Sequence, residues 1–511
     1  MFKKIVEFFR VIGDLKYLIP LLRYKFPDPD DNASLAHSFQ ETVKSFGNNN
    51  FIYFENETWT YAETNVAANK LAHKLAEDGI CHSDRVVLFM ENRSDYIISI
   101  LALNKIGAIG VLINTSLTGK PLIHCINSSD SKKCIVGAEL ASSLEDVLDD
   151  INISNKSDIY WVKDGDKFLC PDWASNLKLL LDDSKIENLD MTDMVTAKDT
   201  AFYIFTSGTT GVPKAALFPN SKIIAASINI TKGGYRMDDS DCMYNCLPLY
   251  HSTGLMLGLC ACVQAGAATF IRRKFSASSF WKEAKQFNTT AFVYVGELCR
   301  YLSFQDPSDE EKNNPISKMV GNGLRPDLWD SFRNRFNVER IIEIYGASEG
   351  NALFMNLLNK DETIGMTNAR VGIFEYDVAE DKLVKNEDGK YIEVEENQPG
   401  LLLVEIGPNA IYNGYTDKKA SEEKVITNVF EKGDRWFNTG DLIKTMDVGF
   451  ALGRKHYQFV DRVGDTFRWK AENVSTNEVA EILNLYDQVN MANVYGVKIP
   501  KSEGRAGMVA F

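Results

Sequence analysis

The sequence predicts an α/β fold with a β-rich part toward its end, on three observations. In the first third of the chain, strand-like and helical runs alternate, which is the rhythm of βαβ units and a parallel sheet. A second α/β region follows from about 199 to 345. Beyond it, residues 371–405 alternate short β-like runs with turns, which indicates a small antiparallel or barrel-like section. The runs of the first region are 85–90 and 109–113 for strands and 65–77 and 96–105 for helices.

Size and charge limit the class of the protein. A chain of 511 residues, 45% apolar and 25% charged, has the balance of a soluble globular protein with at least two domains. Its formal net charge of −14, with no long basic run to offset it, predicts no nucleic-acid partner. An anionic ligand would therefore need a locally positive site.

The cysteines indicate reduced thiols and a cytoplasmic location. There are nine, scattered without the spacing of a disulfide framework. The close pairs Cys242/Cys246 and Cys260/Cys262, with His251 between them, lack the spacing of a structural zinc site.

The first 26 residues predict an amphipathic helix. Apolar residues recur at helical spacing, most charges fall on the other side, and Pro20 marks a kink or stop. Arg10 and Asp14 interrupt any signal-peptide core, and no apolar run reaches the about 18–20 residues that span a bilayer. The helix suits either a membrane interface or a place on the protein's own body, and the sequence leaves both open.

The run Thr206-Ser207-Gly208-Thr209-Thr210-Gly211-Val212-Pro213-Lys214 is the strongest site signal, and it follows a strand-like run at 201–205. Such a loop has little side-chain bulk and many backbone N–H groups, so it can fold around phosphate oxygens with Lys214 as a mobile cation. Its spacing is not the Walker pattern, which excludes a P-loop NTPase. Composition alone would also fit a plain surface loop.

Two later segments could border a ligand. Tyr250 and His251 follow a strand-like run, and the imidazole could orient a carboxylate or phosphate oxygen, although a lone histidine is more often structural. Residues 321–326, which include Gly323, form a turn-rich segment where backbone can approach a flat ligand such as adenine, or an ordinary turn.

Three charged residues complete the series. Glu349 follows the strand-like run 341–345 and could hold Mg²⁺, which prefers one or two carboxylates plus phosphate oxygens. Asp441 follows another strand and could accept hydrogen bonds from both ribose hydroxyls, and Arg462 could reach ribose or phosphate. Each carboxylate alone would fit a solvated surface group, but together and in this order they predict a carboxylate-activating site.

Several segments resemble the fatty acid transport protein / very-long-chain acyl-CoA synthetase family of adenylate-forming (AMP-binding) enzymes, from about residue 50 to the last residue. The resemblance implies a large N-terminal domain of two α/β subdomains plus a distorted β-barrel, followed by a small α+β C-terminal domain that is incomplete here. The expected division is 1–26, a possible membrane anchor, 27–462, the adenylation domain, and 463–511, a mobile domain after a hinge near Arg462. The segments that carry the resemblance are 92–117, 206–214, 321–326, 345–351 and 461–476.

The resemblance implies ATP-dependent activation of a long- or very-long-chain fatty acid to acyl-adenylate and then to acyl-CoA, with Mg²⁺ and CoA, at the periphery of a membrane. Two alternatives stay open. One is an acyl-adenylate former that passes its acyl group to another acceptor, and the other is a non-catalytic fatty-acid-binding or trafficking protein that retains the nucleotide pocket.

The resemblance also assigns roles to residues. Tyr250 and His251 border the carboxylate, and Glu349 is the metal ligand. The catalytic residues are Thr206, Lys214, His251 and Glu349, and the nucleotide-binding residues are Thr206, Ser207, Gly208, Thr209, Thr210, Gly211, Lys214, Gly323, Tyr345, Gly346, Ser348, Asp441 and Arg462.

The end of the chain departs from the family pattern. Residues 475–478 form a capping box that predicts a helix over 479–485, but the roughly 50 residues after Arg462 are near the lower limit for an independent core. The family's C-terminal lysine, which promotes adenylation, has no counterpart here. Ala471 replaces a usual glycine near the CoA channel and could narrow it, and Gly464 stands at the hinge.

Overall fold

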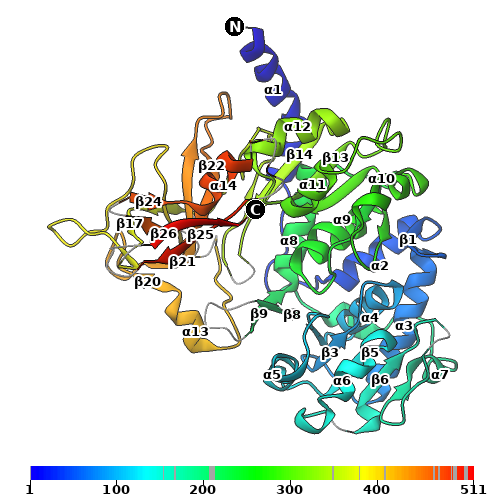
Figure 1. Ribbon diagram of the computed structural model, residues 1–511. Coiled ribbons are helices and arrows are strands. Elements are labelled where there is room, and N and C mark those ends of the chain that lie inside the picture. The colour runs from blue at the N-terminus through cyan, green and yellow to red at the C-terminus, as the bar shows by residue number, and fades with distance from the viewer. Residues whose placement is uncertain are drawn as a thin grey trace.

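The computed structural model describes residues 2–153, 155–165, 168–206, 213–347, 350–378, 380–407, 410–463, 467–469, 472–484, 486, 489, 492–499 and 505–510. Two α/β parts lie on one side of the molecule and a β-rich part lies beside them (Figure 1). This arrangement confirms the predicted α/β fold class.

The N-terminal sheet has seven strands in the order β7-β6-β5-β3-β4-β8-β9, and only the β8–β9 pair is antiparallel. Along β3, Val86 and Leu88 face one hydrophobic core while Val87 and Phe89 face another. The sheet is therefore covered on both faces, as parallel sheets usually are. Its strands are β3 (Arg85–Phe89), β4 (Ile109–Leu112), β5 (Lys133–Gly137), β6 (Ile159–Val162), β7 (Ser175–Asn176), β8 (Thr200–Thr206) and β9 (Lys214–Pro219).

The central sheet has eight strands in the order β15-β14-β13-β12-β10-β11-β1-β2, parallel except for the two edge pairs. Its core is continuous with one core of the N-terminal sheet, so the two α/β parts share a hydrophobic interior. Its strands are β1 (Asn50–Phe54), β2 (Glu57–Thr60), β10 (Cys242–Asn245), β11 (Ala268–Ile271), β12 (Ala291–Val295), β13 (Lys318–Asn322), β14 (Arg340–Tyr345) and β15 (Phe354–Met355).

The β-rich part is built on a five-stranded antiparallel sheet with cores on both of its faces. Leu402 and Val404 of β19 face one core, and Leu401 and Leu403 face the other. The strands of the sheet are β16 (Val371–Phe374), β19 (Gly400–Glu405), β20 (Val425–Thr427), β21 (Arg435–Met446) and β22 (His456–Arg462). Short hairpins pair β17 (Tyr376–Asp377) with β18 (Lys382–Leu383), β23 (Phe467–Trp469) with β24 (Glu472–Val474), and β25 (Asn493–Lys498) with β26 (Arg505–Ala510).

Helices connect and cover the sheets. The α-helices are α1 (Phe2–Leu22), α2 (Leu35–Phe46), α3 (Tyr61–Glu77), α4 (Ser94–Lys105), α5 (Gly119–Ser129), α6 (Ala141–Glu145), α7 (Leu177–Leu180), α8 (Asn220–Ile228), α9 (Cys260–Ala265), α10 (Ala277–Gln286), α11 (Gly296–Ser303), α12 (Pro326–Phe336), α13 (Lys418–Glu423) and α14 (Thr476–Asn484). The described residues also form the π-helices η5 (Asn229–Tyr235) and η6 (Thr253–Leu259). The 3₁₀ turns are η1 (Ala138–Leu140), η2 (Leu148–Asp150), η3 (Lys156–Asp158) and η4 (Asp190–Met194).

The N-terminal helix α1 packs on the body along one face and projects from it at its start (Figure 1). Val11, Leu18 and Leu21 are buried, and α1 contacts η5. The helix ends two residues after Pro20, so this residue acts as a stop.

Helix α14 begins at Thr476, three residues before the predicted start at Val479. The earlier start is explained by a carboxylate of β22, which binds the first residues of the helix. Asp461 Oδ2 accepts hydrogen bonds from Ser475 Oγ at 3.0 Å, Thr476 N at 2.8 Å and Thr476 Oγ1 at 3.1 Å. A first-turn N–H is thus satisfied from outside the helix's own sequence, and the contact ties α14 to the β-rich part.

Candidate active site

A cavity of about 1880 Å³ lies where the two α/β parts meet the β-rich part. Every described residue of the predicted site lines it, although these residues come from all three sheets. They are Thr206, Lys214, Tyr250, His251, Gly323, Tyr345, Gly346, Asp441 and Arg462. Ser207, Gly208, Thr209, Thr210, Gly211, Ser348 and Glu349 lie outside the described residues, as do Gly464 and Ala471, and their roles stay predictions.

The predicted phosphate loop joins two antiparallel strands. Thr206, the last residue of β8, pairs directly with Lys214, the first residue of β9. Thr206 Oγ1 is buried and has no hydrogen-bond partner within the described part of the chain. Lys214 Nζ lies 5.8 Å from the centre of the Tyr415 ring. Because buried hydroxyls normally have a partner, Thr206 Oγ1 is suited to bond a ligand oxygen beside a cation.

Asp441 lies inside β21 and not after a strand, which corrects the expectation from the sequence. The register of β21 against β19 shifts next to it, between the partners of Leu401 and Leu403. Gly440, at φ +75°, adopts the left-handed conformation in this irregular stretch. Such bulges re-aim side chains without ending a strand, and here the strand continues while Asp441 lines the cavity.

Tyr345 and Arg462 flank the Asp441 carboxylate. The Tyr345 hydroxyl donates to Asp441 Oδ2 at 2.6 Å, and Arg462 Nε lies 3.6 Å from Asp441 Oδ1. Burial and the neighbouring carboxylate raise the pKa of Tyr345 well above its usual value, so the hydroxyl stays a donor. The Asp441 side chain is 11% exposed and that of Arg462 is 72% exposed. This corner of the cavity can therefore offer a carboxylate to hydroxyls and a cation to an anion.

The loop after β13 is held by a carboxylate that the sequence analysis did not single out. Glu343 of β14 accepts hydrogen bonds from Tyr294 Oη at 2.6 Å, Gly323 N at 2.9 Å and Leu324 N at 2.8 Å. Gly323 takes φ +80°, a conformation that favours glycine. Burial raises the pKa of Glu343 to about 7, against the lowering effect of its three hydrogen bonds. A lone charge in the apolar run Ile341-Ile342-Glu343-Ile344 was the signal that could have identified it.

His251 stands in the loop after β10, open to the cavity. Its backbone N–H donates to Pro248 O at 3.1 Å, and its ring nitrogen Nδ1 lies 3.4 Å from the backbone nitrogen of Thr253. The protein around the cavity lowers the pKa of His251 by desolvation, so the ring is neutral at neutral pH. A neutral imidazole can still donate or accept one hydrogen bond toward a ligand.

An apolar wall adjoins these polar groups. It comes from α8 and the π-helices η5 and η6, and α8 contacts both of them. π-Helical segments are rare and are frequently found at functional sites. The apolar residues that line the cavity from these helices are Ala225, Ala226, Ile230, Met256 and Leu257.

Comparison with known proteins identifies the family. The family model described as "AMP-binding enzyme" matches residues 39–416. The chain is 37% identical over 485 residues to the medium/long-chain-fatty-acid–CoA ligase FadD6 of Mycobacterium tuberculosis, covering 94% of this chain and 78% of that protein. It is 35% identical over 514 residues to long-chain fatty acid transport protein 6 of Mus musculus, covering 99% and 80%.

A solved structure supports the fold. The crystal structure of the anthranilate CoA ligase AuaEII in complex with anthranoyl-AMP matches with a TM-score of 0.75 at 16% identity, covering 93% of this chain and 86% of that one. Together with the sequence matches, it confirms the resemblance that the motifs indicated. The chain therefore belongs to the AMP-binding enzyme family, with fatty acid transport proteins and a fatty-acid–CoA ligase among its relatives.

Proposed function

We propose that this enzyme activates long- or very-long-chain fatty acids with ATP, first to acyl-adenylate and then to acyl-CoA. One observation carries the proposal: a single cavity joins the polar group around Thr206, Lys214 and Asp441 to the apolar wall from α8, η5 and η6. Its volume of about 1880 Å³ exceeds the roughly 300–1,000 Å³ of pockets for one small ligand. A nucleotide and an acyl chain could therefore be bound side by side.

Each group has a defined task in this proposal. The Thr206 hydroxyl and Lys214 would bind phosphate oxygens, Asp441 the ribose hydroxyls, and neutral His251 with Tyr250 would orient the fatty carboxylate for attack on the α-phosphate. The backbone of Gly323 would flank adenine. Mg²⁺, which Glu349 would hold, would stabilise the charge of the departing pyrophosphate. CoA would then receive the acyl group and release AMP.

Pyrophosphate release with MgATP and palmitate, with and without CoA, tests the proposal directly. We expect release that depends on the fatty acid and is accelerated by CoA, and Lys214→Ala should slow it about 10²–10³-fold. Lys432→Ala, an exposed lysine outside the cavity lining, serves as the control. Release without CoA acceleration would favour another acyl acceptor. ATP binding without any release would overturn the ligase and favour a fatty-acid-binding protein.

We also propose that α1 rests on an anionic membrane surface. Its acidic side chains turn inward, since Asp14 pairs with Arg236 at 2.7 Å and Glu7 pairs with Lys360. Exposed apolar residues remain outside, among them Phe9 at 67% and Leu22 at 71%. Among the described residues no helix is long and apolar enough to cross a bilayer. Phe26, just after α1, lines the cavity, so the helix would hold the site near its lipid substrate.

Flotation with vesicles tests the membrane proposal. The protein should float with vesicles of phosphatidylcholine and phosphatidylserine, and Phe9→Asp should abolish flotation without unfolding the chain. Leu179→Asp, which changes a side chain that is 70% exposed on α7, is the matched control. Equal flotation of both variants would overturn the role of α1.

The division into residues 1–26, 27–462 and 463–511, with a hinge near Arg462, remains a proposal. The bonds from Ser475 and Thr476 to Asp461 support a joint at the end of β22. Limited proteolysis should cut first near residue 463, and slower cutting there when ATP and fatty acid are present would support movement at this point.

A further inference from the structure

Asn92 connects the two α/β parts beside the loop that carries His251. It lies between β3 and α4 of the N-terminal part and is 5% exposed. Its Nδ2 donates to Leu247 O at 2.7 Å and to Arg272 O at 3.2 Å, and its Oδ1 accepts from Leu249 N at 2.8 Å. All three partners are backbone groups of the central part, just after β10 and β11. One side chain therefore uses both of its N–H donors to join two strand ends of another sheet.

The loop that Asn92 binds is also held by its own packing, because Leu247 and Leu249 are buried and the His251 backbone N–H donates to Pro248 O at 3.1 Å. Pro248, between the two bonded residues, has no backbone N–H to offer. Packing is tight on the far side, because a side-chain carbon at Gly254 would lie 2.5 Å from Pro248 O. Tyr250 and His251 follow directly and line the cavity. A shift of the backbone at Leu247–Leu249 would thus move both side chains within the cavity wall.

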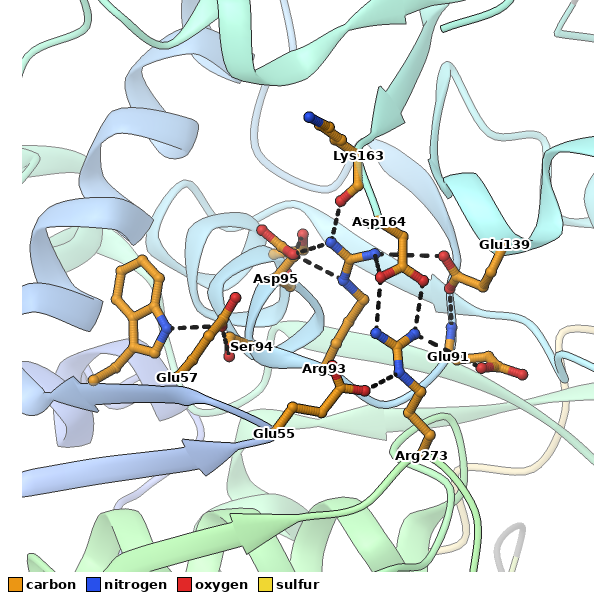
Figure 2. A network of polar contacts seen from close by, with 12 residues as sticks. Glu55, Glu57, Glu91, Arg93, Ser94, Asp95, Glu139, Lys163, Asp164 and Arg273 are labelled. Atoms are coloured by element: carbon orange, nitrogen blue, oxygen red, sulfur yellow. Dashed lines mark hydrogen bonds and ion pairs between the residues drawn. The ribbon is translucent and has the colours of Figure 1, made fainter. Parts of the chain in front are cut away.

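A network of charged groups involves Arg93, the residue that follows Asn92 in the sequence (Figure 2). Arg273, after β11, forms two 2.8 Å hydrogen bonds to Asp164, after β6, and one of 2.7 Å to Glu55, after β1. The buried Arg93 bonds Asp95 and the carbonyl of Lys163 on the N-terminal side. Of these contacts, the Arg273–Asp164 pair crosses between the two parts, whereas the Asn92 amide reaches the backbone just before His251.

We propose that Asn92 is a positioning residue for acyl activation: it sets where Tyr250 and His251 stand in the cavity without touching substrate. The proposal rests on the proposed role of His251 in orienting the fatty carboxylate. Misplacing a reacting group by about 1 Å can cost about 10²-fold in rate, so a small shift of this loop would matter.

Asn92→Asp is the informative variant, because it keeps the shape and the acceptor but turns both donors into oxygen facing two carbonyls. We expect kcat/KM for palmitate to fall about 10²-fold at neutral pH, with the Kd of ATP unchanged. As pH falls toward 6, the introduced carboxyl group would become protonated and donate again, so the variant should recover relative to the unmodified protein. Asn69→Asp is the matched control, since Asn69 is equally buried and donates at 2.7 Å to Ile186 O, far along the chain from the His251 loop.

A second readout does not depend on activity. The rate at which diethyl pyrocarbonate modifies each of the six histidines can be followed by mass spectrometry. Asn92→Asp should change the rate at His251 alone, and Asn69→Asp should leave it unchanged. Unchanged His251 reactivity, or an equal loss of palmitate and ATP affinity without recovery at low pH, would overturn the proposal. Absent palmitate-dependent activity in the unmodified protein, together with altered His251 reactivity in the variant, would instead count against the proposed function and leave the positioning intact.

Discussion

Two carboxylates that line the cavity, Glu343 and Asp441, differ in the partners that hold them. Glu343, on the wall from the central sheet, is 4% exposed and accepts three hydrogen bonds, two of them from the backbone of the loop after β13. Asp441, on the wall from the antiparallel sheet, accepts from Tyr345, lies near the exposed Arg462, and keeps part of its surface toward the cavity. Glu343 positions a backbone loop through its bonds to Gly323 and Leu324, whereas we expect Asp441, beside Tyr345 and the exposed Arg462, to meet a ligand.

Loss of charge at the ligand-facing carboxylate should have the largest effect. Asp441→Asn keeps the shape of the side chain but removes the charge that would receive ribose hydroxyls. We expect adenylation to slow about 10²–10³-fold, while the melting temperature changes little. ATP–pyrophosphate exchange measures the rate, and Asp388→Asn in an exposed turn is the control. A normal rate of ATP–pyrophosphate exchange in Asp441→Asn would contradict the proposed role of the Asp441 carboxylate in binding the nucleotide.

At the positioning carboxylate, Glu343→Gln should affect stability and nucleotide binding together. The amide would set N–H groups against the N–H donors of Gly323 or Leu324, so unfolding should become easier by about 1–3 kcal/mol. Because the carboxyl pKa is about 7 when folded, above its unfolded value of 4.5, the folded state binds more protons between these values.

The sign of the pH effect follows from this difference. In the unmodified protein, the contribution of Glu343 to stability is full below about pH 4.5 and falls as pH rises toward 7. Urea unfolding at several pH values should show that the free energy of unfolding depends less steeply on pH in Glu343→Gln than in the unmodified protein. A slope identical in both proteins would mean that the group titrates normally in the fold.

Lys105 offers a buried charge away from the cavity. It is fully buried, its Nζ donates to Asn65 Oδ1 at 2.9 Å, and burial lowers its pKa to about 7. The unfolded state therefore binds more protons between pH 7 and 10.5, so stability should rise with pH across this window. Lys105→Met should flatten that rise in urea titrations and leave the KM of ATP unchanged. A changed KM for ATP would show that the buried Lys105 affects nucleotide binding as well as stability.

The smallest change in stability should come from Arg462→Gln. The guanidinium is 72% exposed and 3.6 Å from Asp441, and exposed pairs contribute about 0–1 kcal/mol. We expect the free energy of unfolding to stay within about 1 kcal/mol of that of the unmodified protein, and the KM for ATP to rise. A clear loss of stability with an unchanged KM would reverse the assignment of Arg462 to the ligand side.

Hydrophobic periodicity in the sequence predicted several strands and helices of the N-terminal α/β part. The strand-like runs at 85–90 and 109–113 became β3 and β4, and the helical run at 96–105 became α4. These are local patterns, since alternating apolar side chains favour strands wherever both faces are covered. Local motifs likewise singled out Lys214 and His251 as candidates, and their roles remain predictions.

The tertiary structure alone decided what holds those residues in place. Glu343 became an anchor because Gly323 and Leu324 lie about 20 positions away but next to it in space. Asn92 met Leu247 across 155 positions, and Asp461 met the start of α14 across 14 or 15. The sequence pattern placed Asp441 after a strand, whereas it lies inside β21. The register shift of β21 against β19 depends on a partner strand and cannot be read from the local sequence. Hydrogen bonds across long separations depend on the packing of whole sheets, and no local pattern encodes them.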